Sequence, residues 1–346
     1  MKRYETTAPT FEQLRPMKAA TSPTFPIYPK LVDTLVNTAV HPDPTAAHVL
    51  ATCSGYAYSD EQTVAMIAAR LGLADNHCVR ISQDVDAMFI CSTAYVLQSR
   101  CGRVAILCYR GTEPANFINW LTDTDVTPEK ISLPAAGGGP PFAVHAGFYR
   151  NVRATRFEVV TALQRALRGE SILAEGGSMP HPLEALYVTG HSLGAAMAAM
   201  MGTMLVMEEA YAPIADRLRA VYAYGQPMIG NSALAEACRK HKFLGRQVFR
   251  YIYGHDVVAE LPPTASGDFA HFGREFRYED GRWAESDKPT AQMSNLLELP
   301  GAAAAFVAHQ LRWLRNLPFQ HSIYDHEPQH YVSALTPAGV RSEFGD

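Results

Sequence analysis

The sequence has little charge of either sign in excess. Of its 346 residues, 30 are Lys or Arg and 34 are Asp or Glu, which gives a formal net charge of −4 with His counted as neutral. Proteins that attract nucleic acid or anionic lipid over a broad surface carry an excess of positive charge. The composition therefore argues against that kind of binding, and we expect no nucleic-acid partner.

Long hydrophobic runs are absent as well. The longest nearly uninterrupted apolar stretch covers residues 193–207 and ends at Glu208, which is short of the ~20 residues that a membrane-crossing helix needs. The first 30 residues contain Glu5 and several prolines where a secretory signal would have an apolar segment. We therefore expect neither a transmembrane anchor nor an N-terminal signal peptide.

Cysteine is scarce for a chain of this length. Several of the cysteines lie within apolar segments, as Cys91 and Cys108 do, and the full set is Cys53, Cys78, Cys91, Cys101, Cys108 and Cys238. This usage does not indicate a disulfide framework and favours buried free thiols in a reducing compartment. We expect a cytoplasmic location, and export by a route without an N-terminal signal stays open.

The residues that are present predict an α/β fold. Hydrophobic residues make up 47% of the chain, enough to fill a sizeable core. Residues 87–98 and 104–109 predict an antiparallel hairpin. Three strand segments follow, at 185–189, 220–224 and 247–253, and helical segments at 194–207 and 232–241 come after the first two. Short apolar strands that alternate with helices indicate a mostly parallel central sheet flanked by helices.

Other segments do not follow this alternation. Residues 1–44 are rich in Thr and Pro and predict an N-terminal arm lying over the surface. The spacing from Ser59 to Gly72 predicts a capped amphipathic helix. Residues 264–320 predict a helical insertion, in which residues 302–314 form a helix that covers the core or meets substrate or lipid. We expect a single domain over residues 1–346.

The pentapeptide Gly190-His191-Ser192-Leu193-Gly194 carries the first chemical signal. It follows a β-rich segment and opens a run of small residues, which is the setting of a nucleophile elbow. At such a sharp turn the serine backbone is strained, and the positions two residues to either side must be small so that strand and helix can approach. Ser192 is therefore the candidate nucleophile.

A serine hydroxyl needs a base to take its proton and an acid to orient that base, expected in the order Ser, Asp or Glu, His. Asp256 follows the predicted strand 247–253 directly, which favours it over Asp268 and Asp280. Three histidines compete for the role of base: His321, His326 and His330. Their spacing does not choose among them.

An oxyanion formed at the substrate carbonyl needs hydrogen-bond donors. The residue after the nucleophile supplies one, the backbone N–H of Leu193. Thr112 follows the predicted strand 104–109 and offers an N–H and a hydroxyl, although the same residues also fit a simple turn with a hydroxyl cap. His326 and His330 are four residues apart, but no matching Cys or His cluster completes a metal site. We expect no metal and no cofactor.

Taken together, these motifs resemble the class 3 lipase family of α/β-hydrolases, which cleave acylglycerols and related carboxylic esters. The similar blocks, in chain order, are 110–112 with 119–123, 144–148, 224–231, and Asp256 with 261–263. The family's late His-Ser-x-x-x-Tyr-x-x-Ala-Leu pattern aligns through Tyr331, Ala334 and Leu335 and selects His326. The chain departs from the family with Glu327 in place of a common serine and Met228 in place of a common arginine.

The resemblance implies a lipase acting through Ser192, Asp256 and His326, with Thr112 and Leu193 as the oxyanion hole. It also implies a lid at residues 113–119, with Phe117, Ile118 and His191 contacting substrate. The expected partners are an acylglycerol or other lipid ester and, transiently, a lipid interface. Three alternatives remain: a carboxylesterase of the same fold acting on short-chain or aromatic-acid esters, a non-catalytic hydrolase-like binding domain, and a calcium-dependent bacterial lipase of another family that shares the pentapeptide.

Overall fold

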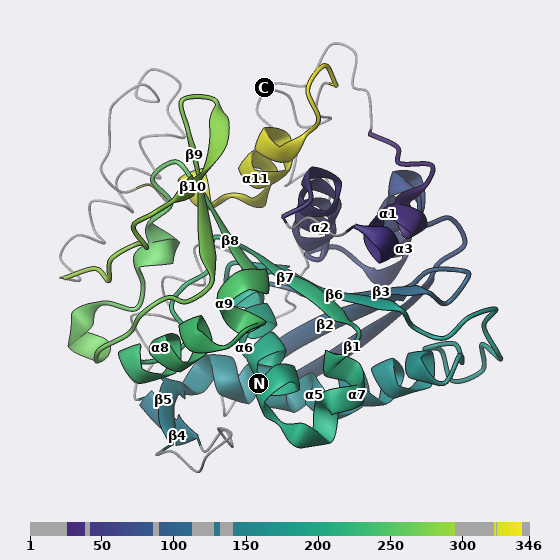
Figure 1. Cartoon of the computed structure of the whole chain (residues 1–346), viewed down its shortest axis with the longest axis horizontal. Coiled ribbons are helices and arrows are strands. Elements are labelled where there is room, and N and C mark those ends of the chain that lie inside the picture. The colour runs from purple at the N-terminus through teal and green to yellow at the C-terminus, as the bar shows by residue number, and fades with distance from the viewer. Residues whose placement is uncertain are drawn as a thin grey trace, which may run out of the picture.

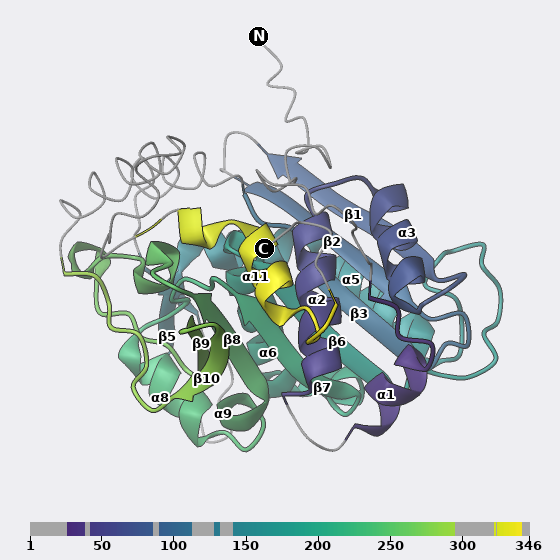
Figure 2. The same ribbon diagram turned by 90° about the horizontal axis from the view of Figure 1, so that it is seen from above.

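Among the described residues, eight strands form a sheet at the centre of the structure. The computed structural model describes residues 26–38, 42–85, 90–112, 128–131, 141–294, 322 and 324–340. Figure 1 shows this sheet with helices on both faces, and Figure 2 shows the same arrangement from above. The strand order is β1-β2-β3-β6-β7-β8-β9-β10, and β4 and β5 form a separate pair. This is the predicted α/β class, a mostly parallel central sheet flanked by helices.

The direction of the strands determines where functional side chains meet. β1, β2 and β3 are antiparallel neighbours, β3, β6, β7, β8 and β9 run parallel, and β10 returns antiparallel to β9. The bounds are His77–Val85, Ile90–Gln98, Val104–Tyr109, Pro128–Ile131, Phe142–His145, Ala185–His191, Leu218–Tyr224, Val248–Tyr253, Arg274–Glu279 and Arg282–Ser286 for β1 to β10. The carboxyl ends of the parallel strands therefore lie along one edge, where loops deliver functional groups.

In the described part of the chain, one face of the sheet is covered by the helices α1 (Leu31–Asn37), α2 (Pro44–Tyr56), α3 (Glu61–Leu71) and α11 (Pro328–Leu335). Buried strand tyrosines hold the N-terminal helices on this face. The Tyr187 hydroxyl donates to the carbonyl of Leu35 and the Tyr224 hydroxyl donates to that of Ala47, while the Tyr222 hydroxyl accepts from the N–H of Asp43. Each aromatic ring fills the core while its hydroxyl satisfies a backbone group.

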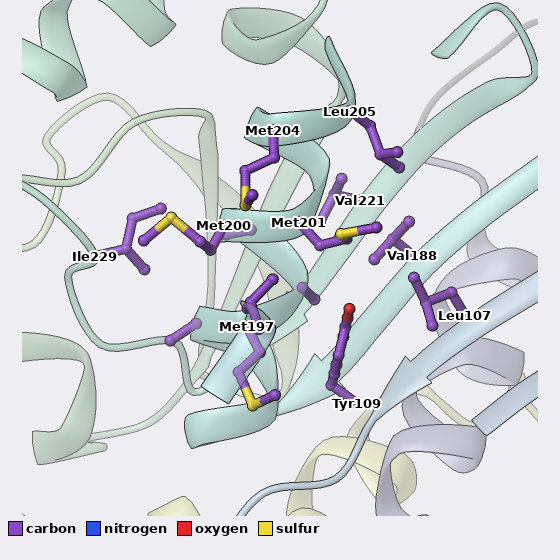
Figure 3. Packing of buried hydrophobic residues seen from close by; sticks show 14 of the residues in the cluster. Leu107, Tyr109, Val188, Met197, Met200, Met201, Met204, Leu205, Val221 and Ile229 are labelled. Carbon is purple, nitrogen blue, oxygen red and sulfur yellow. The ribbon is translucent and has the colours of Figure 1, made fainter. Parts of the chain in front are cut away.

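The opposite face is covered by α5 (Ala146–Leu167), α6 (Leu193–Met207), α8 (Ser232–Lys240) and α9 (Leu244–Gln247), with the short helix α7 (Ala212–Ala215) beside them. Helix α6 lies against the sheet and is buried over most of its length. Figure 3 shows Met197, Met200, Met201 and Met204 filling the space between this helix and its neighbours. Flexible methionine side chains suit such an irregular gap.

The apolar run noted in the sequence is therefore a core helix. Within the part of the chain that the structure describes, no single helix is long and apolar enough to cross a membrane. Helix α6 and the segment Glu209–Ala215 reach that length and apolar composition only when they are taken together, and a bend of 96° separates them.

The predicted strand and helix units agree well with β2, β3, β6, α6, β7, α8 and β8. The helix expected from Ser59 is α3, although Asp60 and not Ser59 caps it, through a hydrogen bond from the N–H of Thr63. The six cysteines form no disulfide among the described residues. Cys91 is exposed, Cys101 is half-buried, and the other four are buried as expected.

Two expected segments differ from the structure in their described parts. The N-terminal arm instead contains α1, and Leu31 and Leu35 are completely buried because helical spacing places both on the core side. The expected helical insertion instead begins with a short 3-10 turn, Thr264–Ser266, followed by β9 and β10, which extend the sheet. The expected helix at 302–314 and the expected lid at 113–119 lie outside the described residues.

Candidate active site

The strand-to-helix turn at Ser192 has the strained backbone expected of a nucleophile elbow. Ser192 lies between β6 and α6 with φ 61° and ψ −128°, a region that a residue with a side chain rarely adopts. The flanking glycines are required by close contacts. A Cβ on Gly190 would lie 2.2 Å from the carbonyl oxygen of Gly194, and a Cβ on Gly194 would lie 2.3 Å from that of Tyr109. The steric role predicted for both glycines is thus present.

The elbow holds Ser192 deep in the molecule. Its N–H donates to the carbonyl of Tyr224 at 3.0 Å, and its side chain is fully buried. Within the described residues, its Oγ makes no hydrogen bond. Leu193 is the first residue of α6, so its N–H is among the helix-start donors that have no acceptor within the helix. Such a donor beside a serine suits a developing oxyanion.

Asp256 and His326, which are distant in the sequence, meet at the edge of the sheet next to this elbow. Asp256 follows β8, and His326 ends the 3-10 turn Tyr324–His326. Nδ1 of His326 lies 2.8 Å from Oδ2 of Asp256, and both side chains are completely buried. The carboxylate can only accept when ionised, so Nδ1–H donates and Nε2 is left as the basic nitrogen.

Further donors fix the Asp256 carboxylate. Its Oδ1 accepts from the N–H of Val258 at 2.9 Å, and its Oδ2 also accepts from the hydroxyl of Tyr331. Tyr331 in turn accepts from the N–H of Tyr253 at 3.2 Å. Because both carboxylate oxygens are held, the imidazole of His326 has one orientation in which it can donate.

The two loops that carry Asp256 and His326 are joined by their backbones. The N–H of Ser322 donates to the carbonyl of His255 at 2.8 Å, and the N–H of Val257 donates to the carbonyl of Ser322 at 3.3 Å. The carboxylate of Asp325 accepts from the N–H of His255 at 2.8 Å. Burial raises the pKa of Asp325, and the neighbouring charge of Asp256 adds to this effect. These bonds tie the loop of the acid to the loop of the histidine.

The other acid and base candidates that the structure describes lie away from this pair. His330 stacks on Tyr253 with ring centroids 5.0 Å apart, and His321 lies outside the described residues. Asp268 is exposed and accepts from the hydroxyl of Ser232, while Asp280 is an exposed turn residue with φ 52° between β9 and β10. Of the candidates that the structure describes, it brings together Asp256 and His326.

Thr112 lies beside the elbow, as its position after β3 predicts. Tyr109 at the end of β3 pairs with Gly190 in β6. A Cβ on Gly111 would lie 2.6 Å from the carbonyl oxygen of His191, so the Gly111-Thr112 turn packs directly on the residue before Ser192. Phe117 and Ile118, which were expected to contact substrate, lie outside the described residues.

His191 is the expected site residue whose placement differs most from the prediction. It was expected to contact substrate, but its side chain is only 1% exposed. Its Nδ1 lies 2.9 Å from the hydroxyl of Tyr58, and its Nε2 lies 2.7 Å from the carbonyl oxygen of His326. Protein groups therefore occupy both ring nitrogens. Sequence reasoning missed Tyr58, because nothing local to that residue signals a partner 133 positions away.

Within the described residues, no group of three or more His, Cys, Asp or Glu side chains could hold a metal ion. The ionisable side chains around Ser192 are instead arranged for hydrogen bonding and proton transfer. A strained serine, a buried aspartate–histidine pair and N–H donors beside them make up the set of groups used in acyl transfer through a serine nucleophile.

Comparison with known proteins places part of the chain beside a family of lipases. The family model "Lipase (class 3)" matches residues 106–266, which include Thr112, Ser192 and Asp256. Over these residues the chain is similar to the class 3 lipase family. His326 lies beyond the segment matched by the class 3 lipase model, and its pairing with Asp256 comes from the structure.

Curated proteins are similar to this chain over part of their length. Triacylglycerol lipase OBL1 of Ricinus communis is 29% identical over 206 residues, which cover 50% of this chain and 38% of that protein. A lipase of Rhizomucor miehei is 26% identical over 209 residues, covering 59% of this chain and 51% of that protein. The chain thus spans about half or less of the length of these relatives.

Solved structures show the same fold. The Rhizomucor miehei lipase propeptide complex has a TM-score of 0.53 at 20% identity, covering 83% of this chain and 86% of that one. A lipase from Rhizopus microsporus var. chinensis has a TM-score of 0.54 at 19% identity, covering 94% of this chain and 99% of that one. This likeness shows that the chain has the α/β-hydrolase fold.

Proposed function

We propose that this protein is a serine hydrolase that cleaves carboxylic esters of lipids, with acylglycerols as the favoured substrates. The observation that carries the proposal is the buried hydrogen bond between His326 Nδ1 and Asp256 Oδ2, placed beside an elbow that strains Ser192. The relatives named as triacylglycerol lipases support the choice of substrate class. We also propose that residues 1–346 form a single domain that carries this site.

The proposed reaction proceeds through an acyl-enzyme. Nε2 of His326 takes the proton of the Ser192 hydroxyl as Oγ attacks the ester carbonyl, and the N–H groups of Leu193 and Thr112 stabilise the oxyanion. The protonated His326 then donates to the leaving alcohol. His326 then takes a proton from a water molecule as the water oxygen attacks the acyl carbonyl. It returns this proton to Oγ of Ser192 as the carboxylic acid leaves, and the free enzyme is restored.

Asp256 has two tasks in this scheme. Its carboxylate holds Nδ1–H of His326, which leaves Nε2 as the nitrogen that accepts the proton, and its charge stabilises the imidazolium that forms. Since only the neutral imidazole accepts a proton, the rate should rise with pH and level off at mildly alkaline pH. A rate that does not change between acid and alkaline pH would count against the mechanism.

Access to Ser192 bears on the kind of substrate. Ser192 is completely buried, so an ester reaches it only after covering residues move. If contact with a lipid surface drives this movement, the rate of hydrolysis should increase when the substrate forms an emulsion. The lid expected at residues 113–119 stays a prediction.

The test combines covalent labelling with a substrate profile on the whole chain. A fluorophosphonate probe should label the wild type and not Ser192→Ala, and Ser192→Ala should lower turnover by several orders of magnitude. Rates on esters of increasing acyl length, measured below and above emulsion formation, identify the substrate class. A rate that does not change when the emulsion forms, together with a preference for short acyl chains, would indicate a carboxylesterase instead of a lipase. Absence of labelling together with absence of hydrolysis would leave a non-catalytic binding domain.

A further inference from the structure

His191 connects the nucleophile elbow to the loop of the proposed base. It directly precedes Ser192, and its Nε2 lies 2.7 Å from the main-chain carbonyl oxygen of His326. The two imidazole rings lie with centroids 4.6 Å apart and an interplanar angle of 33°. A single buried side chain thus sets the spacing between the segment that carries Ser192 and the segment that carries His326.

The hydrogen-bond chemistry fixes the state of His191. A carbonyl oxygen can only accept, so Nε2–H of His191 is the donor. Burial and, secondarily, the neighbouring His326 hold the pKa of His191 well below its ordinary value, so the ring is neutral and its Nδ1 is an acceptor. The hydroxyl of Tyr58, 2.9 Å from Nδ1, must therefore donate to it. The chain of donors runs from Tyr58 through His191 to the carbonyl of His326.

Tyr58 also touches the turn that carries the proposed oxyanion donor. A Cβ on Gly111 would lie 2.2 Å from the Tyr58 hydroxyl oxygen and 2.6 Å from the carbonyl oxygen of His191. Tyr58 is 3% exposed and follows α2. Its hydroxyl is thus enclosed between the Gly111-Thr112 turn and the ring of His191.

We propose that Tyr58 and His191 are a pair of positioning residues that hold the oxyanion turn, the nucleophile and the base at their working separation. This inference rests on the proposed function, since it assigns the pair to the chemistry of Ser192 and His326. Neither side chain is a proton carrier in the reaction. Their effect passes through the backbone of His326 and through the turn at Gly111.

Two substitutions of His191 distinguish an effect on the position of the reacting groups from an effect on packing alone. His191→Phe keeps a ring and removes both hydrogen bonds, whereas His191→Gln keeps a donor and an acceptor near the original positions. The Phe variant should lose roughly 10–100-fold in kcat with KM changed less than about threefold, because small misplacements of reacting groups cost this much in rate. The Gln variant should recover most of the loss. The rate of fluorophosphonate labelling should follow kcat.

Tyr58→Phe tests the second member of the pair. It should lower kcat by several-fold, and the double variant Tyr58→Phe/His191→Phe should be no slower than His191→Phe alone, because the two act in series. Tyr187→Phe is the matched control, since it loses one buried hydroxyl that donates to a carbonyl far from the site. It should lower Tm by a similar amount and leave kcat unchanged.

A spectroscopic readout makes the test independent of activity. In the whole chain labelled with 15N-histidine, His191 should give the neutral Nε2–H tautomer at pH 7 and keep it as the pH falls to 5. The His326 signals should shift in His191→Phe and stay in place in Tyr187→Phe. The proposal is overturned by a His191 ring that titrates near pH 6.5, or by Phe and Gln variants with wild-type kcat. Equal losses in the Phe and Gln variants, or a loss confined to KM, would also overturn it.

The two proposals fail in different ways. A wild type that is neither labelled nor active, while His191 shows the expected tautomer, contradicts the proposed function and the catalytic part of this inference together. An active wild type, an inactive Ser192→Ala and an unaffected His191→Phe contradict this inference alone.

Discussion

The Cα of Gly225 lies so close to the imidazole of His326 that a Cβ on Gly225 would come within 2.7 Å of Nδ1. The same Cβ would come within 2.7 Å of Oδ2 of Asp256. Gly225 follows β7 with φ 59°, a conformation that glycine adopts without strain. The proposed acid and base therefore pack on a position where no side chain fits.

We expect Gly225→Ala to remove most of the activity. The added methyl group meets the very atoms that form the hydrogen bond between Asp256 and His326, so kcat should fall by about 100-fold or more, as for other small displacements of catalytic groups. Gly177→Ala is the control, because Gly177 also has positive φ, 71°, but its Cβ would meet nothing within 4 Å. That control should lose about 1 kcal/mol of stability and no activity. Comparable kcat values for the two variants would contradict the assignment.

Tyr331→Phe should lower both stability and kcat. The substitution removes the hydroxyl that donates to Asp256 and leaves the N–H of Tyr253 without its acceptor, which costs about 1–3 kcal/mol for a buried donor. We expect a roughly tenfold loss of kcat, because the carboxylate that orients His326 is then held less firmly. Tyr222→Phe is the matched control, since its hydroxyl accepts from the N–H of Asp43 away from the site. Denaturant unfolding and steady-state kinetics on both variants separate the two effects.

Acid should destabilise the protein well above the pH at which carboxylates protonate. Burial lowers the pKa of His48 to about 4 and that of His145 and His271 to about 3, and it also lowers that of His191. Below the unfolded value of about 6.5, the unfolded state binds protons that the folded state does not. Stability should therefore fall as the pH drops below that value, by up to about 1.4 kcal/mol per pH unit for each such histidine.

Chemical unfolding at pH 7.5, 6 and 5 measures this dependence. His48→Leu removes one of the buried histidines from a position on α2, so the variant should show a shallower loss of stability with falling pH. A wild-type free energy of unfolding that stays constant between pH 7.5 and 5 would contradict the prediction.

The ion pair between Arg250 and Glu275 should be far more important for stability than its exposed neighbour. Both side chains are 1% exposed, with Nη2 and Oε2 2.9 Å apart. Glu275→Gln leaves the buried guanidinium without its counter-charge, which should cost about 3–5 kcal/mol. Glu285→Gln breaks the nearby pair with Arg274, which is partly exposed, and should cost less than about 1 kcal/mol. Equal losses of unfolding free energy would show that the difference in burial has no effect.

The elements that could be predicted from the sequence are those with local signals. The apolar runs of β2, β3, β6, β7 and β8 and the spacing of α3, α6 and α8 are each readable within a short window. Ser192 could be predicted because the glycines on either side of it indicate a turn that has no room for larger side chains. Asp256 could be predicted because it follows the end of a strand. The hairpin of β9 and β10 was missed because its strands carry charged residues that only pairing in the sheet accommodates.

The amino-acid sequence by itself determined the α/β class, the strained serine turn and the short list of acids and bases, because these depend on residue size, periodicity and order along the chain. The family resemblance selected His326 as the base, but only the tertiary structure showed that it meets Asp256, and that His191 faces Tyr58 and a backbone carbonyl instead of substrate. The reason is physical. These contacts join segments between 70 and 135 residues apart, and burial and hydrogen-bond geometry select one partner among several that the local sequence leaves equivalent.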